Sequence, residues 1–92
     1  MDTEAVKKAI VVNVYHILAS EEIPLHKHPK SDEIFYCIKG AGYGVLEDGE
    51  VALAVGQVFV VRAGTKHSLR TDGGLFVTSF LVPIVADTES TD

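Results

Sequence analysis

The sequence predicts an all-β sandwich or barrel built from many short strands. Its apolar segments are brief and rich in β-branched and aromatic residues, and glycine-containing turns separate them at near-regular intervals. Short strands at such a spacing are typical of sandwiches and barrels. Beyond residues 1–8, no stretch long enough for a helix keeps a helical apolar period without a Gly or Pro. A helical fold is therefore disfavoured.

The strands are expected in the following order. Residues 9–18 carry a run of β-branched side chains and predict the first strand. Asp48-Gly49, between two apolar segments, is a strong signal for a two-residue hairpin. The remaining strands are expected at residues 33–38, 51–55, 58–61, 68–70 and 75–82.

The chain is long enough for one domain. With 92 residues and a single cysteine, it has no internal disulfide to staple a small fold. We expect an N-terminal extension at residues 1–8, one β-domain at 9–86 and an acidic, disordered tail at 87–92.

The apolar content is high for so small a domain. Hydrophobic residues make up 47% of the chain, and the mean hydropathy is +0.22. Counting alternate residues from Glu33 places Phe35 and Cys37 inside the barrel and leaves Ile34 and Tyr36 outside. Strands that are apolar on both faces are buried on both, so we predict a homodimer joined through outer barrel faces.

Charge and hydropathy argue against two classes of partner. The net charge is −5 and no basic stripe is present to neutralise phosphates, so nucleic-acid binding is not expected. No apolar stretch is long enough to span a bilayer, and no export signal is recognisable, so we predict no membrane partner and a cytoplasmic protein.

Three histidines and one glutamate are the candidate metal ligands. His26 and His28 are two residues apart, which in a strand places both side chains on one face with Cα atoms about 6.6 Å apart. Glu33 opens the next strand, and His67 follows a turn far along the chain. An isolated His-x-His beside a proline is more often a solvated turn than a metal site. Whether these residues bind a metal therefore depends on the wider sequence pattern around them.

That wider pattern resembles the cupin superfamily. The first motif holds His26, His28, Glu33 and, after six intervening residues, Gly40. The second holds Gly56, Arg62-Ala63-Gly64 and His67. The resemblance implies a jelly-roll barrel that holds one divalent transition metal, Fe, Mn, Zn or Ni, through His26, His28, Glu33 and His67. The sequence departs from the family pattern at Ser20, Gln57, Arg62 and Thr71, none of which is a ligand position.

Other residues near the motifs carry weaker predictions. His16 shares a strand face with Val12 and Val14. It is expected to be either a core or dimer-face histidine bonded to a carbonyl, or an acid–base group that lines the pocket. Phe35 and Arg62 are candidate substrate-binding residues, the arginine for an anionic group. Cys37 is expected to be a small buried hydrophobe and not a ligand.

The sequence therefore predicts a metal-binding protein with a small-molecule partner. One hypothesis is a metal-dependent enzyme, of dioxygenase or isomerase type, that acts on a small oxygenated molecule. The alternative is a non-catalytic module that binds a small molecule or a metal as a sensor. One barrel fold hosts many activities, so the fold does not choose between them.

Overall fold

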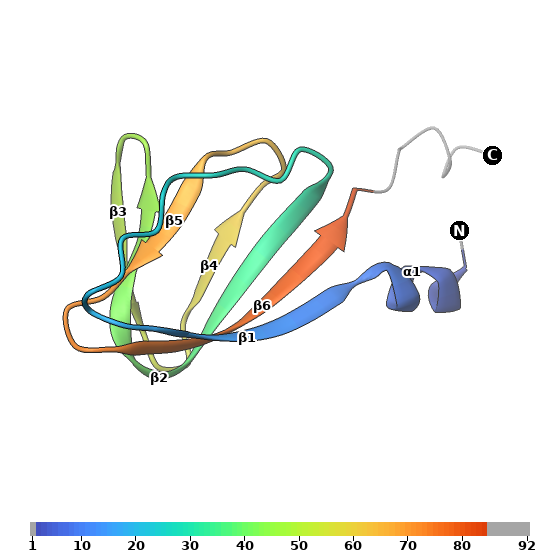
Figure 1. Ribbon diagram of the computed structural model, residues 1–92. Helices are drawn as coiled ribbons and strands as arrows, with labels where there is room; N and C mark the ends of the chain where they lie inside the picture. Colours follow the sequence, from blue (N-terminus) through green and yellow to red (C-terminus); the bar gives the residue numbers. More distant parts are fainter. Residues whose placement is uncertain (1, 85–92) are drawn as a thin grey trace.

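Two β-sheets face each other in a computed structural model that describes residues 2–84 (Figure 1). The order of elements is α1 (Thr3–Ala9), β1 (Val11–Ile17), β2 (Ser31–Leu46), β3 (Gly49–Ala54), β4 (Val58–Val61), β5 (His67–Arg70) and β6 (Leu75–Pro83). All strand pairs are antiparallel. The architecture is the predicted all-β barrel, and the tail predicted at 87–92 lies outside the described residues.

Strand β2 belongs to both sheets. Its first part, up to Gly40, pairs with β6 and β4, and with β1 beyond β6 these strands form sheet A. From Ala41 onward β2 pairs with β3 and β5 in sheet B. The register shifts between Cys37 and Lys39, and Gly40 has φ +79 with a Cβ position only 2.2 Å from the Gly74 carbonyl oxygen. Only glycine fits this bend, so one continuous strand replaces the predicted strand that ended at Ile38.

The β2–β3 hairpin turns one residue earlier than predicted. Leu46 pairs with Gly49, so the two-residue loop consists of Glu47 and Asp48. An Asp-Gly loop is favoured where both loop residues have positive φ. Here no non-glycine residue does, and Gly49 is not among the positive-φ glycines. The glycine consequently begins β3.

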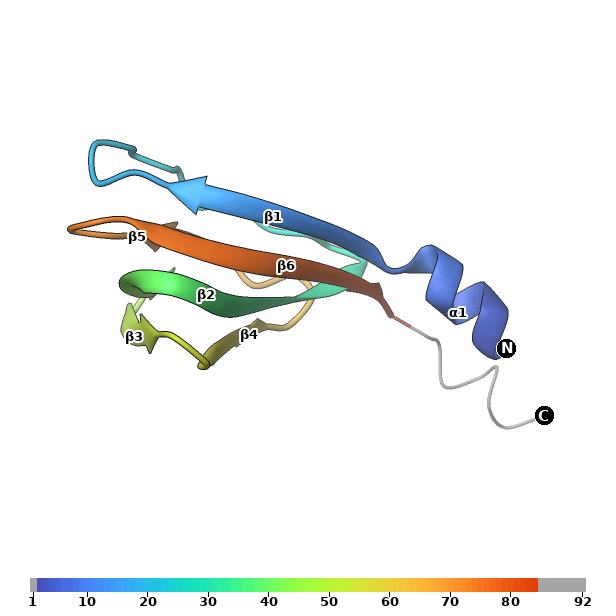
Figure 2. The same ribbon diagram turned by 90° about the horizontal axis from the view of Figure 1, so that it is seen from below.

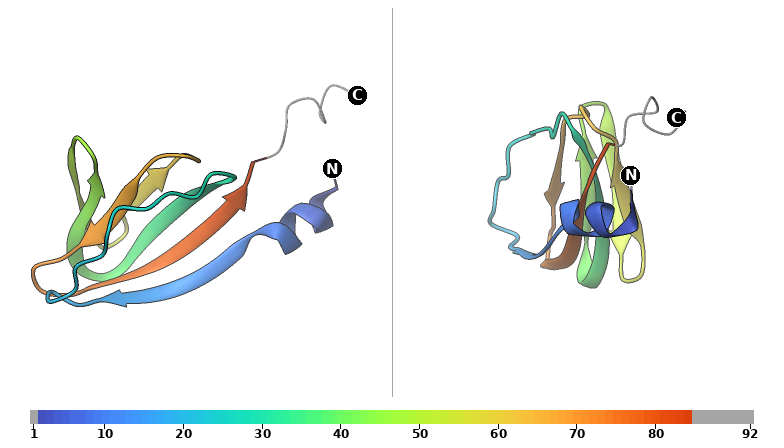
Figure 3. Two further views of the ribbon diagram at one scale, coloured as in Figure 1. Left: turned by 45° about the horizontal axis from the view of Figure 1, so that its top comes forward. Right: turned by 90° about the vertical axis from the view of Figure 1, so that its right-hand side faces the viewer.

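The first residues, expected only as an N-terminal extension, form a short helix. Asp2 caps α1, because its Oδ1 accepts a hydrogen bond of 2.8 Å from the Ala5 amide. The helix includes Ala9, so the first strand starts later than predicted, at Val11. No α1 residue is buried, and the helix projects beyond the end of the sheets (Figure 3). No helix in the described part is long and apolar enough to cross a membrane.

The core lies between the two sheets. Phe35, Cys37, Leu53, Leu75 and Val77 are at most 4% exposed. Each buried side chain of this size contributes about 1.5–3 kcal/mol to folding. The alternation predicted from Glu33 is confirmed, since Tyr36 and Ile38 on the other face are 40% and 44% exposed. The inner face of β2 therefore carries Glu33 into the space between the sheets.

Candidate metal centre

Four donor side chains meet between the sheets, near one end. One ligand atom from each of His26, His28, Glu33 and His67 lies within 4.8 Å of all the others. Glu33 comes from β2 and His67 from the start of β5, whereas His26 and His28 belong to the segment between β1 and β2. The four residues that the sequence predicts as ligands are thus brought together.

Backbone hydrogen bonds hold the histidine segment in place. His26 and His67 exchange both of their backbone N–H···O bonds, at 3.0 and 2.8 Å, which makes a single β-bridge. The His28 carbonyl accepts from the Gly64 amide at 2.9 Å. The extended strand expected around His26 and His28 is thus reduced to one bridge, which still places both rings toward Glu33. Their ring centroids lie 5.4 Å apart.

Two of the rings are oriented by carbonyl groups outside the cluster. His26 Nδ1 lies 3.1 Å from the Pro24 oxygen, and His67 Nδ1 lies 2.8 Å from the Thr65 oxygen. A carbonyl only accepts, so each Nδ1 donates and carries the ring proton. The Nε2 atoms then present lone pairs, as metal-binding histidines do when a second partner holds the other nitrogen.

Glu33 is the buried acceptor at the centre of the cluster. It is 4% exposed, and its Oε1 lies 2.9 Å from His67 Nε2 and 3.2 Å from His28 Nε2. Its Oε2 accepts a hydrogen bond of 2.5 Å from Ser79 Oγ. A metal-binding His67 is neutral with its ring proton on Nδ1, and its Nε2 and Glu33 Oε1 would then both turn lone pairs toward the ion. The donor set therefore fits a divalent metal ion.

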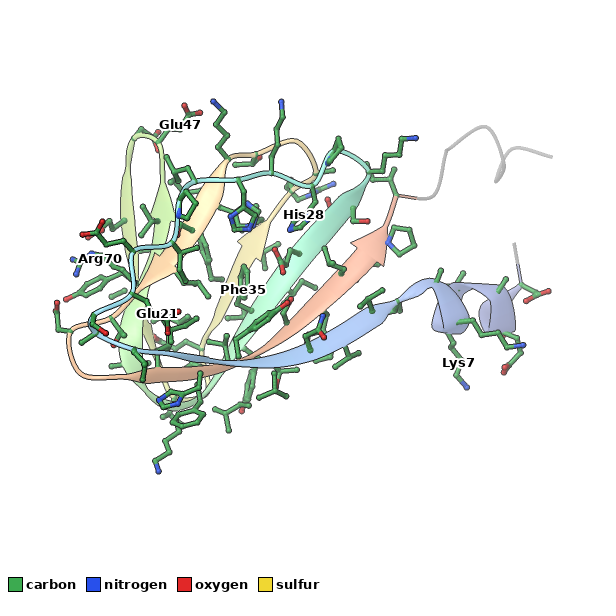
Figure 4. The ribbon with its side chains drawn as sticks, viewed as in Figure 1. Lys7, Glu21, His28, Phe35, Glu47 and Arg70 are labelled. Atoms are coloured by element: carbon green, nitrogen blue, oxygen red, sulfur yellow. The ribbon has the colours of Figure 1, made fainter. Side chains whose placement is uncertain are left out.

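The cluster opens into a small cavity of about 260 Å³. His26, His28 and Glu33 line one part of it, and the rest of the lining is mainly apolar: Ile17, Ile23, Phe35, Leu69 and Leu81, with Tyr15 and Ser68. Figure 4 shows His28 and Phe35 in the space between the sheets. The Phe35 ring centroid is 6.0 Å from that of His67. Phe35 thus lies where a molecule beside the cluster would pack.

Arg62 lies away from this cavity. Its side chain is 80% exposed and its Nε donates to Asp32 Oδ1 at 3.3 Å. The same oxygen accepts from the Ala63 amide at 2.8 Å. Arg62 therefore belongs to the turn after β4, and the structure does not place it at the cavity wall.

His16 also lies outside the cavity, because the inner residues of β1 are Tyr15 and Ile17. His16 is exposed on the opposite face and stacks on Phe76, with ring centroids 3.9 Å apart and an angle of 8° between the planes. Val12 and Val14, which share its face, are 56% and 65% exposed. The core reading of His16 is wrong, and an acid–base role at the cluster does not fit its position.

Cys37 takes no part in the cluster. It is fully buried, and burial raises the pKa of its thiol. Its Sγ lies 3.7 Å from the carbonyl oxygens of Lys39 and Gly40, at the bend of β2. It packs in the core, as the sequence predicts.

Sequence reasoning missed two polar residues. Ser79 is the one hydroxyl among the inward positions of β6 that contacts Glu33, and alternation from Leu75 and Val77 would have found it. Tyr15 lines the cavity beside Ile17. The sequence does not identify it, because the alternation of β1 leaves open which of its two faces points inward.

Comparison with known proteins agrees with this geometry. Two sheets around three histidines and one carboxylate define a β-barrel with a candidate metal site. The Cupin domain family matches residues 13–82, so the chain belongs to the cupin family. No curated protein sequence matches the chain.

Solved structures share the fold. A predicted oxalate decarboxylase from Thermotoga maritima is 22% identical, with 91% of this chain and 76% of that chain covered and a TM-score of 0.77. A cupin protein from Bacteroides fragilis is 18% identical, with 84% and 68% covered and a TM-score of 0.75. The DMSP lyase DddQ from Ruegeria pomeroyi is 22% identical, with 83% of this chain but 39% of that chain covered and a TM-score of 0.74. At these identities the likeness shows the fold alone.

Proposed function

We propose that the protein is a metal-dependent enzyme, of dioxygenase or isomerase type, that acts on a small oxygenated molecule. The observation that carries the proposal is the convergence of four donors, three of which line a mainly apolar cavity. A cavity of about 260 Å³ is small beside the roughly 300–1,000 Å³ clefts that hold drug-sized ligands. The substrate is accordingly a small molecule.

His26, His28, Glu33 and His67 would hold the ion. A bound divalent metal supplies Lewis-acid chemistry and coordination positions for substrate oxygen atoms. Three neutral imidazoles and one carboxylate leave a divalent centre with net positive charge, which favours an anionic oxygen donor such as a carboxylate or an enolate.

The remaining lining determines how such a molecule is held. Phe35, Leu69 and Leu81 provide apolar surface that excludes water and packs against the carbon skeleton. Ser68 Oγ donates to the Ile23 carbonyl at 2.7 Å, so its proton is engaged. Tyr15, which is 42% exposed, is the phenol in the lining. In this proposal it is the residue that donates a hydrogen bond or a proton to a bound oxygen.

Metal content tests the first half of the proposal. Purified wild-type protein is expected to bind about one equivalent of a transition metal, and His28→Ala is expected to retain less than about a tenth of it. His16→Ala is the matched control, because it removes the same side chain from the outer face. Wild-type protein that takes up no metal when supplied with Fe, Mn, Zn or Ni would contradict the site.

Turnover tests the second half. Oxygen consumption by metal-loaded protein with catechol-like and diketone substrates separates dioxygenase activity from isomerisation, which consumes no oxygen. The alternative function is a non-catalytic sensor of a small molecule or a metal. It is favoured by the scarcity of acid–base groups in the cavity lining, where Tyr15 is the single candidate beyond the ligands. Binding of such molecules without any turnover would support the sensor.

A further inference from the structure

Residues 18–30 close one side of the barrel, and we call this segment the strap. It leaves the end of β1, the edge strand of sheet A, and reaches the start of β5 in sheet B, where His26 bridges to His67. Figure 2 shows its first turn beyond β1, and Figure 3 shows the strap standing apart from the strands. The strap supplies Ile23, His26 and His28 to the lining of the cavity. One wall of the cavity is therefore made by a segment that contains no strand.

Few contacts hold the strap against the rest of the described chain. None of its residues is buried; Ile23 and His28 are half-buried, and the others are exposed. Between Leu18 and His26, one hydrogen bond joins the strap to the rest of the described residues. It runs from Ser68 Oγ to the Ile23 carbonyl, at 2.7 Å. Segments with so few buried apolar contacts open at a lower free-energy cost than the core, so we expect the strap to open without unfolding of the barrel.

Three backbone hydrogen bonds join the end of the strap to β5 and to the turn before it. The His26 amide donates to the His67 carbonyl at 3.0 Å, and the His67 amide donates to the His26 carbonyl at 2.8 Å. The Gly64 amide donates to the His28 carbonyl at 2.9 Å. We call the amides of His26, Gly64 and His67 the boundary amides. They exchange hydrogen with water when the strap leaves the barrel or the whole barrel unfolds, so their exchange rates report the opening of the strap.

The candidate metal ligands lie on both sides of this boundary. His26 and His28 belong to the strap, whereas Glu33 and His67 belong to strands of the barrel. Coordination by all four residues is possible while the strap is closed and is lost when it opens. A ligand that binds one arrangement alone reduces the population of the other, by a factor set by its concentration relative to its Kd. Metal binding is therefore expected to hold the strap closed.

We propose that the strap is a metal-operated gate. It completes the wall of the cavity when its histidines share a metal ion with Glu33 and His67, and it opens when the ion leaves. The inference rests on the metal site of the proposed function and is independent of the reaction. It gives metal binding a second role, because the cavity that would hold the small molecule is enclosed in the loaded protein. Conversely, a molecule that requires the enclosed cavity would tighten metal binding by the same factor by which the metal tightens its own binding.

Amide hydrogen exchange with and without Zn²⁺ tests the gate, with metal uptake measured on the same samples. At a free Zn²⁺ concentration about 100 times the Kd, exchange at His26, Gly64 and His67 is expected to slow about 100-fold. The Gly56 amide is the matched control, because it also donates to a carbonyl at 3.0 Å, that of Cys37, in the turn between β3 and β4. Its exchange rate should change less than about twofold.

Variants separate the gate from a general stabilisation of the fold. His28→Ala removes a ligand from the strap and is expected to abolish the effect of Zn²⁺, whereas His16→Ala, on the outer face, should retain it. Ser68→Ala removes the hydrogen bond to the Ile23 carbonyl and leaves the ligands in place. It should speed exchange at His26 about 2- to 10-fold in metal-free protein, with the control amide unchanged.

The outcomes distinguish the gate from the metal site. Stoichiometric uptake of zinc with unchanged exchange at the boundary amides would overturn the gate and leave the site standing. Equal slowing of the control amide would also overturn the gate, because zinc would then stabilise the whole barrel. Unchanged exchange in Ser68→Ala would show that the strap does not open as one unit. Protein that takes up no metal overturns the site and the gate together, whereas a failure to find turnover affects neither, because these measurements contain no substrate.

Discussion

Ser79 holds Glu33 from the side opposite the histidines. The Ser79 hydroxyl donates to Glu33 Oε2 at 2.5 Å, while Oε1 faces the imidazoles of His28 and His67. Both residues are at most 4% exposed. A buried carboxylate with one oxygen fixed in this way has one orientation toward the cluster, so Ser79 acts as a positioning residue for the carboxylate.

Ser79→Ala is expected to weaken metal binding about 10- to 100-fold, because Glu33 loses the partner that orients it. The buried Oε2 would also be left without a donor, which lowers the free energy of unfolding by about 1–3 kcal/mol. Metal competition titration measures the first effect and urea unfolding the second. Thr78→Ala removes a hydroxyl from the outer face of the same strand and should leave metal affinity unchanged. Equal affinities in Ser79→Ala and wild type would contradict the positioning role.

The ligand set was predictable because it depends on local spacing and on a family pattern. His26 and His28 sit close together in the sequence, and Glu33 and His67 stand at fixed distances within the two motifs. The structure brings all four together. The inward face of β2 was predictable for a similar reason, since a strand has only two faces and Glu33 marks one of them.

The positions of other residues could not be predicted, because they depend on tertiary contacts that the spacing of residues in the sequence does not encode. Either face of β1 reads as apolar, so pairing with β6 decides that Tyr15 faces the cavity and His16 faces out. Arg62 is drawn outward by Asp32, which lies thirty positions away. The homodimer and the cytoplasmic location stay predictions.

Gly44 is expected to be intolerant of any side chain. A Cβ at this position would lie 2.5 Å from ring atoms of Phe59, which is itself buried. Overpacking of this kind costs about 1–3 kcal/mol, so Gly44→Ala should lower the urea midpoint clearly. Gly49→Ala is the matched control, because nothing lies within 4 Å of its Cβ position. If both variants unfold at the same urea concentration, the contact with Phe59 does not constrain this site.

Cys37 is expected to be unreactive in the folded protein. The side chain is fully buried, and burial raises the pKa of the thiol, so both access and the reactive thiolate are reduced. Ellman's reagent at pH 8 should label less than about a tenth of the protein within minutes and all of it in denaturant. Rapid labelling of the native protein would show that the bend of β2 opens readily.

Glu50 is expected to contribute to the loss of folding stability at acidic pH. The hydrogen bond from Arg70 lowers the pKa of the Glu50 carboxyl below its ordinary value of 4.5. A lowered pKa in the folded state gives stability that is present above the ordinary pKa and is lost as the pH falls through the folded value. Glu50→Gln should therefore reduce the fall in melting temperature on acidification from neutral pH, whereas Glu47→Gln, in the neighbouring turn, serves as the charge-matched control. Because the pair is at the surface, high salt should shrink the difference between Glu50→Gln and wild type. If the melting temperatures of wild type and Glu50→Gln fall equally on acidification at low salt, the ion pair adds nothing to stability.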